Sequence, residues 1–358
     1  MRYSALTVPS VSAIGTALPT NYVSQECLSN AISAFWGSSG ATFEACQRLH
    51  KSTMVSGRYL ALPMPDYREL TSFETSNAAW MRMAPELALR AARSAVSKAE
   101  VDPQDVGHLF LVTGTGIATP SIDTRIIEGL DINPQVKRTP IFGLGCAGGA
   151  AGIARAADYL RAFPNERALL IAVELCSVTL QLSDTSVANQ IASGLFGDGA
   201  AAAVLAGRDF ADPGAPRILG SRSVLYPRTE RVMGWDIIDS GFKIVMSPAI
   251  PDLVRQHVPK DVDNFLAEYS LERQDIKYWI AHTGGPKVLR AIEEGLGLKP
   301  DVLKRSWDSL CRMGNLSSAS VLFVLADLLG EKEHKPGDFG LMLGLGPGFC
   351  LELVLLRW

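Results

Sequence analysis

The chain has 358 residues, of which 47% are hydrophobic and 20% are charged, a composition typical of a globular protein with a large core. Its formal net charge is −3, and no basic run is present, which argues against binding to nucleic acid or to lipid headgroups. No uncharged apolar stretch reaches the roughly 18 residues that a membrane span requires.

The first residues and the spacing of the cysteines indicate in which cellular compartment the protein resides. The first residues are interrupted by Pro9 and lack the pattern of a signal peptide. The cysteines are scattered and no two have Cys-x-x-Cys spacing, which argues against a zinc site or a secreted disulfide framework. We therefore expect a cytoplasmic protein that binds no metal.

The first long segment with a clear periodicity is helical. Residues 25–100 are predicted to be mostly helical, with apolar residues at helical spacing around 81–92. We expect this range to form a helical insertion near the mouth of an active site, within an N-terminal half that covers residues 1–210.

Two later stretches resemble each other. Residues 104–116 and residues 274–285 both predict a buried strand followed by a glycine-rich bend, and each is followed by a helix. Thr113 occupies the place of His282, and Cys146 and Asn315 each lie 33 positions further along the chain. A repeat on this scale predicts two similar α/β halves, residues 1–210 and 211–358, stacked as αβαβα layers.

Three residues stand where such a repeat would present them. Cys146 follows a strand-like run and opens a helix of small residues, Asn315 does the same in the second half, and His282 follows a strand-like segment. Lowering a thiol pKa by two units takes about 2.7 kcal/mol. A helix N-terminus supplies only about 0.3–1 kcal/mol. A reactive Cys146 therefore requires an ion pair with a protonated His282.

Asn315 suits a different role, because a carboxamide does not transfer protons usefully but donates to developing negative charge. With His282 it would form a two-donor oxyanion site, which the decarboxylation of a malonyl thioester requires because the product is an enolate. That enolate would then attack an acyl group on Cys146. Asn315 could also act as an N-cap, which is compatible with catalysis.

A glycine-rich segment near the C-terminus has another explanation than phosphate binding. Residues 344–348 lack the Lys-Ser/Thr of a phosphate loop and are followed by a strand-like run. We expect this backbone to pass close to the reactive centre.

Taken together, these motifs resemble those of the chalcone/stilbene synthase-like family, the type III polyketide synthases of the thiolase superfamily. The resemblance extends over essentially the whole chain and implies a thiolase-like, duplicated αβαβα fold. It is carried by residues 145–149, 174–179, 195–202, 282–287, 314–323 and 344–348.

The resemblance implies an acyltransferase that is a homodimer and uses acyl-CoA and malonyl-CoA as substrates, with no separate cofactor and no acyl carrier protein. Cys146, His282 and Asn315 match the catalytic triad of the family. Phe196 matches an aromatic gatekeeper between the CoA tunnel and the cavity, and Ile244 replaces a second aromatic gatekeeper of the plant enzymes.

Further positions follow from the same resemblance. Thr119 falls where a neighbouring subunit usually contributes a side chain, and Trp235 replaces a small residue of the plant enzymes. Arg48 matches a contact to the CoA phosphates, and Lys51 lies one step from a second such position, which is Ser52 here. The implied cavity positions are Gly114, Thr115, Thr119, Cys176, Thr179, Trp235 and Ser317.

The chain is more similar to the bacterial branch that makes alkylpyrones or alkylresorcinols than to plant chalcone synthases. Small residues at positions 114 and 119 could open a tunnel for an aliphatic starter, whereas Trp235 narrows another part of the cavity. We expect a medium- or long-chain fatty acyl-CoA starter and two or three malonyl extensions.

Three other interpretations remain open at this point. A ketoacyl-carrier-protein synthase III has the same fold and triad, but would carry His-Gln-Ala-Asn at the histidine and a basic docking patch. A cysteine–histidine hydrolase or amidase would lack decarboxylase activity. A catalytically inactive duplicate that serves as a binding subunit would not need the complete triad.

Overall fold

The computed structural model describes residues 8–36 and 41–358, so the first residues, which we expected not to form a signal peptide, lie outside the described part of the chain. The strands are Ser10–Ala17 (β1), Asn21–Ser24 (β2), Gly57–Leu60 (β3), Val106–Val112 (β4), Lys137–Ile141 (β5), Arg167–Leu175 (β6), Asp198–Ala206 (β7), Arg217–Leu225 (β8), Met233–Ile238 (β9), Gly241–Met246 (β10), Ile276–Ala281 (β11), Phe339–Gly346 (β12) and Cys350–Arg357 (β13). The α-helices are Gln25–Trp36 (α1), Ala41–Ser52 (α2), Phe73–Lys98 (α3), Asp123–Leu130 (α4), Gly148–Ala162 (α5), Val187–Leu195 (α6), Ile250–Ala267 (α7), Pro286–Leu296 (α8), Lys304–Met313 (α9) and Ser320–Glu331 (α10).

The main sheet consists of two half-sheets that meet at one point. Over the described residues its strand order is β11-β12-β13-β8-β1-β7-β6-β4-β5. Within the described residues, the two half-sheets are hydrogen-bonded to each other between β8 and β1, where Ser10 pairs with Arg217. From this junction outward, both halves repeat the same pattern of two antiparallel pairs followed by a parallel pair. The internal duplication expected from the sequence is therefore present in the topology.

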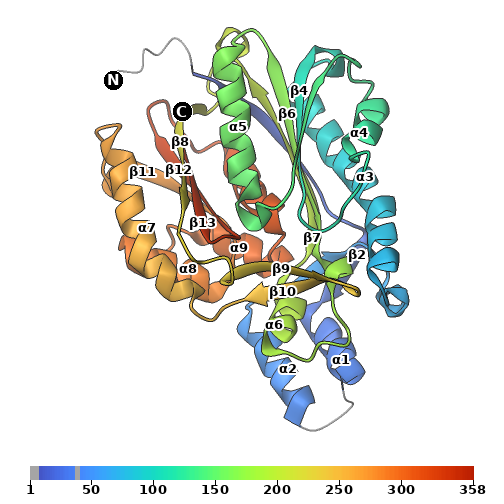
Figure 1. The fold of residues 1–358 in the computed structure, drawn as a ribbon. Coiled ribbons are helices and arrows are strands. Elements are labelled where there is room, and N and C mark those ends of the chain that lie inside the picture. The colour runs from blue at the N-terminus through green and yellow to red at the C-terminus, as the bar shows by residue number, and fades with distance from the viewer. Residues whose placement is uncertain (1–7, 37–40) are drawn as a thin grey trace.

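Helices cover both half-sheets and separate them. Helix α3 packs on β1, β7 and β6, while α5 and α10 lie between the half-sheets and contact strands of both. Helices α7 and α8 share a hydrophobic cluster with β11, β12 and β13 on the opposite outer face. Figure 1 shows α5 between the two half-sheets, with α3 and α4 on one outer side and α7 and α8 on the other. The five-layer αβαβα arrangement is confirmed.

Small residues make the central layer possible. A Cβ atom added to Gly149 of α5 would lie 2.1 Å from the carbonyl oxygen of Ser318, and one added to Gly152 would lie 2.6 Å from Leu170. Larger side chains would push α5 away from Ser318 in the second half and from Leu170 of β6 in the first, because packed cores do not yield to added volume. The helices after Cys146 and Asn315 are close-packed for this reason.

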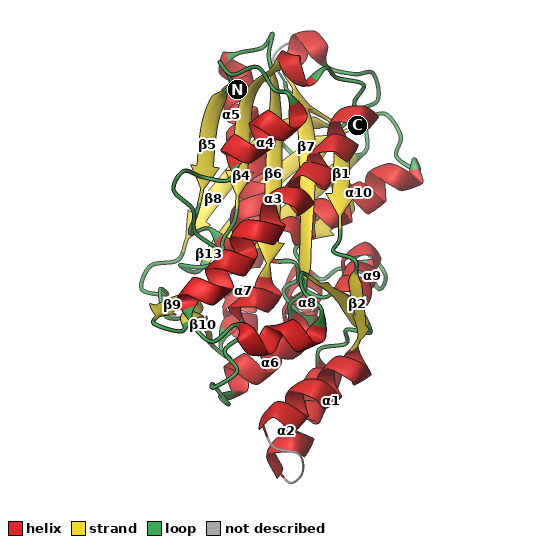
Figure 2. Ribbon diagram, turned by 90° about the vertical axis from the view of Figure 1, so that its right-hand side faces the viewer, coloured by secondary structure: helices red, strands yellow, loops and turns green. Residues whose placement is uncertain are grey.

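The helical range 25–100 divides into two parts. Helices α1 and α2 gather with α6 and the β9–β10 hairpin at one end of the molecule (Figures 1 and 2). Helix α3, in contrast, runs along the sheet and buries a face that includes Ala84, Ala88 and Ala91. The expectation that the whole range lies at the active-site mouth is therefore corrected: α3 belongs to the outer layer, because its alanine face fits closely against β1 and β7.

Two kinds of feature are absent from the residues that the structure describes. In the described part of the chain, no helix is both long enough and apolar enough to span a membrane. Within the same residues, no group of three or more His, Cys, Asp or Glu side chains is arranged to hold a metal ion.

The close contact at Gly149 gives a stability prediction. Gly149→Ala should destabilise the fold by about 1–3 kcal/mol, the usual cost of overpacking, because the added methyl group meets a backbone oxygen. Gly330→Ala, also in a central helix but with open space around its Cβ position, is the matched control and should be neutral or stabilising. Urea unfolding of both variants measures the difference. Equal midpoints would contradict the packing account.

Candidate active site

Cys146 sits in a tight turn that only glycine neighbours allow. It is the middle residue of a short 3-10 turn, Gly145–Ala147, that leads directly into α5. Gly145 has φ 44°, and its missing Cβ would lie 2.8 Å from Pro347. A Cβ on Gly346 would lie 2.6 Å from that of Ala147. The segment 344–348 therefore passes against the cysteine turn, as the sequence predicted.

Asn315 is held by its backbone on one side and by its amide oxygen on the other. Its N–H donates to the Leu195 carbonyl at 2.9 Å, and its carbonyl accepts from Gly197 N–H at 2.9 Å. Oδ1 accepts from the Ser317 N–H at 2.8 Å and from Ser320 Oγ at 3.3 Å. Since the oxygen is occupied, the NH₂ group is the end of the amide that is available to a ligand.

The thiol lies beside this amide. Cys146 is 7% exposed, and its Sγ lies 3.6 Å from Ser317 Oγ. Both Ser317 and the Asn315 side chain hydrogen-bond the sulfur and lower its pKa, but burial outweighs them and raises it to about 12. The turn after β5 and the turn before α10 thus bring Cys146, Asn315 and Ser317 together.

His282 reaches the same region from the second half-sheet. It follows β11 and is 2% exposed. Its backbone N–H donates to the Leu343 carbonyl of β12 at 2.9 Å. The residues after Leu343 in β12 continue onto the cysteine turn, since a Cβ on Gly344 would lie 3.4 Å from the Cα of Ala147. Within the described chain, the Nδ1 atom of His282 is buried and has no partner.

Burial acts on both members of the expected ion pair. It raises the pKa of Cys146 to about 12 and lowers the pKa of His282 to about 3. Each shift favours the neutral form, because a single charge loses its hydration in this site. Burial therefore disfavours a lone thiolate or a lone imidazolium, so a charged Cys146 requires that its proton pass to His282 and that the two charges arise together. The ion pair expected from the sequence stays a prediction.

Glu174 is a buried carboxylate to which the sequence analysis assigned no role. It is the penultimate residue of β6 and accepts hydrogen bonds from Gly114 N–H at 3.0 Å, Thr115 Oγ at 2.9 Å and Ser318 Oγ. It thereby joins the end of β4 to the turn that follows Asn315. Desolvation raises its pKa to about 7, although these hydrogen bonds act in the opposite direction. The sequence offered two signals, an acidic residue near the end of an apolar run and its place at the start of the motif 174–179, but neither specified these partners.

A cavity of about 780 Å³ lies next to this centre. Of the cavity residues expected from the resemblance, Cys176, Thr179, Phe196, Trp235 and Ile244 line it. Sequence reasoning missed a large part of its wall, which is contributed by α1, β3 and the 3-10 helix Met64–Glu69; these residues include Leu28, Ile32, Phe35, Arg58, Leu60, Met64 and Tyr67.

The remaining expected cavity residues lie elsewhere. Gly114, Thr115 and Ser317 are buried around Glu174 and the Cys146 turn and do not line this cavity. Thr119 is exposed on the loop after β4. Arg48 is exposed on α2, where it pairs with Glu44 at 3.5 Å, and Lys51 is exposed on the same helix.

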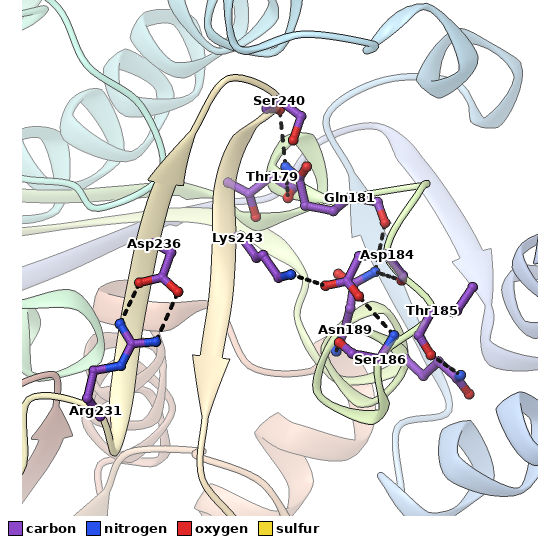
Figure 3. A network of polar contacts seen from close by, with 11 residues as sticks. Thr179, Gln181, Asp184, Thr185, Ser186, Asn189, Arg231, Asp236, Ser240 and Lys243 are labelled. Atoms are coloured by element: carbon purple, nitrogen blue, oxygen red, sulfur yellow. Dashed lines mark hydrogen bonds and ion pairs between the residues drawn. The ribbon is translucent and has the colours of Figure 1, made fainter.

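The β9–β10 hairpin closes one side of the cavity. The indole N–H of Trp235 donates to the Gly114 carbonyl at 3.0 Å, which links the hairpin to the end of β4. Gln181 donates to the Ser240 carbonyl at 3.2 Å, and Lys243 lies 3.7 Å from Asp184. Figure 3 shows these contacts between the hairpin and the segment before α6. These contacts hold the hairpin in place, and with it the Trp235 and Ile244 side chains that line the cavity.

Comparison with known proteins decides the family. The model of the N-terminal domain of chalcone and stilbene synthases matches residues 2–210, and that of the C-terminal domain matches residues 218–358. The chain belongs to this family, the type III polyketide synthases. It is an acyltransferase-type condensing enzyme.

Individual relatives agree with this family. The chain is 46% identical to the 1,3,6,8-tetrahydroxynaphthalene synthase of Streptomyces peucetius subsp. caesius, over 98% of this chain and 93% of that protein. It is 38% identical to a putative chalcone synthase of Bacillus subtilis, over 97% and 98% of the two chains. Among solved structures, the 1,3,6,8-tetrahydroxynaphthalene synthase of Streptomyces coelicolor A3(2) superposes with a TM-score of 0.92 at 29% identity, covering 98% of this chain and 99% of that one.

The electrostatics of the pair give a pH prediction. In His282→Gln the thiol loses its proton acceptor, so its pKa should rise by about one unit or more. The thiolate fraction at neutral pH, and with it the rate of alkylation of Cys146 by iodoacetamide, should fall by about tenfold or more. The rate should recover only at higher pH, because burial holds the thiol pKa up. Mass spectrometry of the Cys146 peptide across neutral and alkaline pH measures this.

His257→Gln is the matched control, because His257 stacks on Tyr226 rather than lying near the thiol. It should keep the wild-type profile. A His282→Gln profile identical to that of the wild type would contradict the proton transfer.

Proposed function

We propose that this enzyme loads a fatty acyl group from CoA onto Cys146, extends it with malonyl-CoA and cyclises the product to an alkylpyrone or alkylresorcinol. The observation that carries the choice of starter is the cavity of about 780 Å³, whose wall is largely apolar. CoA thioesters are substrates here, and Arg48 and Lys51 are the proposed contacts to their phosphates.

The chemistry uses the three residues in sequence. Cys146 sulfur attacks the acyl carbonyl while its proton passes to His282, and CoA leaves as a thiol after taking up a proton. Malonyl-CoA then loses its carboxylate as CO₂, and the electron pair of the broken bond forms the enolate. The imidazole and the Asn315 amide donate to the enolate oxygen. The enolate carbon attacks the acyl carbonyl, and the Cys146 sulfur leaves.

An aliphatic starter fits the wall of the cavity because the polar side chains of Tyr67, Ser177 and Arg58 already bond within the protein. Tyr67 Oη and Ser177 Oγ bond one another at 2.6 Å, and the Arg58 guanidinium bonds backbone carbonyls. The remaining surface is dominated by hydrocarbon from α1 and from residues 60–64. Burying an acyl chain against it is favourable by about 0.8 kcal/mol for each CH₂.

A second candidate function is favoured by the relative from Streptomyces peucetius subsp. caesius. Its name specifies 1,3,6,8-tetrahydroxynaphthalene, a fused aromatic with oxygen at alternating carbons, which is the pattern that malonyl units supply without a fatty starter. In this case the cavity would hold the folded intermediate instead of an alkyl tail.

We also propose that the enzyme is a homodimer in the cytoplasm. Ile117 is 40% exposed and Phe142 is 50% exposed, on the loops that follow β4 and β5. Thr119 lies on the first of these loops, where the partner subunit would cover it. Burial of both apolar side chains in a second copy is the supporting reason.

A panel of acyl-CoA starters with malonyl-CoA tests the choice. Mass spectrometry of the products should show the highest kcat/KM with starters between hexanoyl- and palmitoyl-CoA, and products that retain the alkyl chain. Preference for aromatic starters, or tetrahydroxynaphthalene from malonyl-CoA alone, would contradict the fatty acyl proposal.

One variant links the result to the cavity. Ala192 lines it, so Ala192→Phe should lower kcat/KM for palmitoyl-CoA by about tenfold relative to hexanoyl-CoA, since filling a close-packed wall costs about 1–3 kcal/mol. Val187→Phe, on the same helix but 61% exposed, is the control and should leave the ratio unchanged.

A further inference from the structure

Arg58 is a buried arginine with no exposed surface. It lies on β3, has 0% exposure and contributes to the wall of the cavity. An arginine is rarely buried unless its charge and its donors are matched by partners. Burial lowers its pKa to about 9, while nearby Asp198 acts in the opposite direction.

Its partners are the last carbonyls of α6. Nη1 donates to the Ser193 carbonyl at 3.0 Å and to the Phe196 carbonyl at 2.8 Å, and Nη2 donates to the Gly194 carbonyl and to Gln25. The final carbonyls of a helix have no partner within the helix, and a cation there is also favoured by the helix dipole. One guanidinium therefore closes the C-terminus of α6.

The segment that Arg58 holds is the one that holds Asn315. The backbone of Asn315 is bonded on both sides, to Leu195 and to Gly197, which flank Phe196. The two segments pack so closely that neither glycine could carry a side chain. A Cβ on Gly314 would lie 2.5 Å from the Leu195 carbonyl oxygen, and a Cβ on Gly197 would lie 2.5 Å from the Met313 carbonyl oxygen.

We propose that Arg58 is a positioning residue that sets both the Phe196 gate and the carboxamide of Asn315 through residues 193–197. It does not touch the reacting atoms. The inference rests on the proposed condensing function, in which Asn315 donates to the enolate oxygen.

The chemistry of the side chain explains why it is an arginine. A planar guanidinium presents several donors in fixed directions, so one group reaches three carbonyls and the Gln25 side chain at once. A lysine would keep the charge but satisfy fewer of these acceptors. The remaining buried carbonyls would then lack a partner, and the segment would relax.

Arg58→Lys and Arg58→Met test the proposal. Both variants should displace the Asn315 carboxamide by up to about 1 Å. This displacement should lower kcat for malonyl-CoA decarboxylation by roughly 10- to 100-fold, with a smaller change in KM. Alkylation of Cys146 should stay within about threefold of the wild-type rate, because burial is the largest influence on the thiol pKa and the hydrogen bond from Asn315 is a smaller one. Arg58→Lys keeps a buried cation and covers the case in which Arg58→Met does not fold.

Arg273→Met is the matched control. Arg273 closes another helix in the same way, donating to the Leu296 carbonyl at 2.9 Å and the Pro259 carbonyl at 3.3 Å, but it lies against α7 and the end of α8. This variant should lose unfolding free energy while keeping the wild-type kcat. Urea unfolding of all variants provides the comparison.

The outcomes separate the two claims. If the wild-type enzyme does not decarboxylate malonyl-CoA, the proposed function fails. If it does, and the Arg58 variants lose activity only in proportion to their folded fraction, Arg58 is merely structural and the positioning proposal is overturned.

Discussion

The active site depends on how closely the two halves of the chain approach each other at the centre. Gly149 of α5 packs directly on the carbonyl of Ser318, with no room for a methyl group. Cys146 and Asn315 lie in the turns at the beginning of the two central helices, so this contact decides whether thiol and carboxamide meet. The pattern of strands repeated on either side of the β8–β1 junction delivers His282 from the second half.

A second consequence of this packing is electrostatic. The centre is dry enough that burial opposes charge on Cys146, His282 and Glu174 alike, raising the pKa of both acids and lowering that of the imidazole. Such a site disfavours any single charge. It favours steps in which charges appear in pairs or next to prepared donors, as thioester exchange and enolate formation require.

Much of this arrangement could be predicted from the sequence, because duplication leaves equal spacings. The equal spacing in sequence from Thr113 to Cys146 and from His282 to Asn315 predicted the two halves. The glycines of residues 344–348 predicted that this backbone passes close to the reactive centre. The roles of Arg58 and Glu174 could not be predicted. Their partners are backbone groups and hydroxyls far away in the chain, and such contacts leave no periodicity. The ion pair of Cys146 and His282 stays a prediction from the sequence, to which the structure adds that burial disfavours either charge alone. The position of α3 could not be predicted either, because its alanine face has the same helical periodicity whether the helix packs on a sheet or lies at the mouth of an active site.

The central claim is that Asn315 and His282 form an oxyanion site that works independently of the thiol. The most direct measurement is malonyl-CoA decarboxylation by Cys146→Ala, compared with the same variant that also carries Asn315→Ala. The account predicts that Cys146→Ala releases CO₂ and forms acetyl-CoA, and that loss of the amide lowers this rate by about 10²–10³. Equal rates in the two variants, or no decarboxylation by Cys146→Ala, would contradict it.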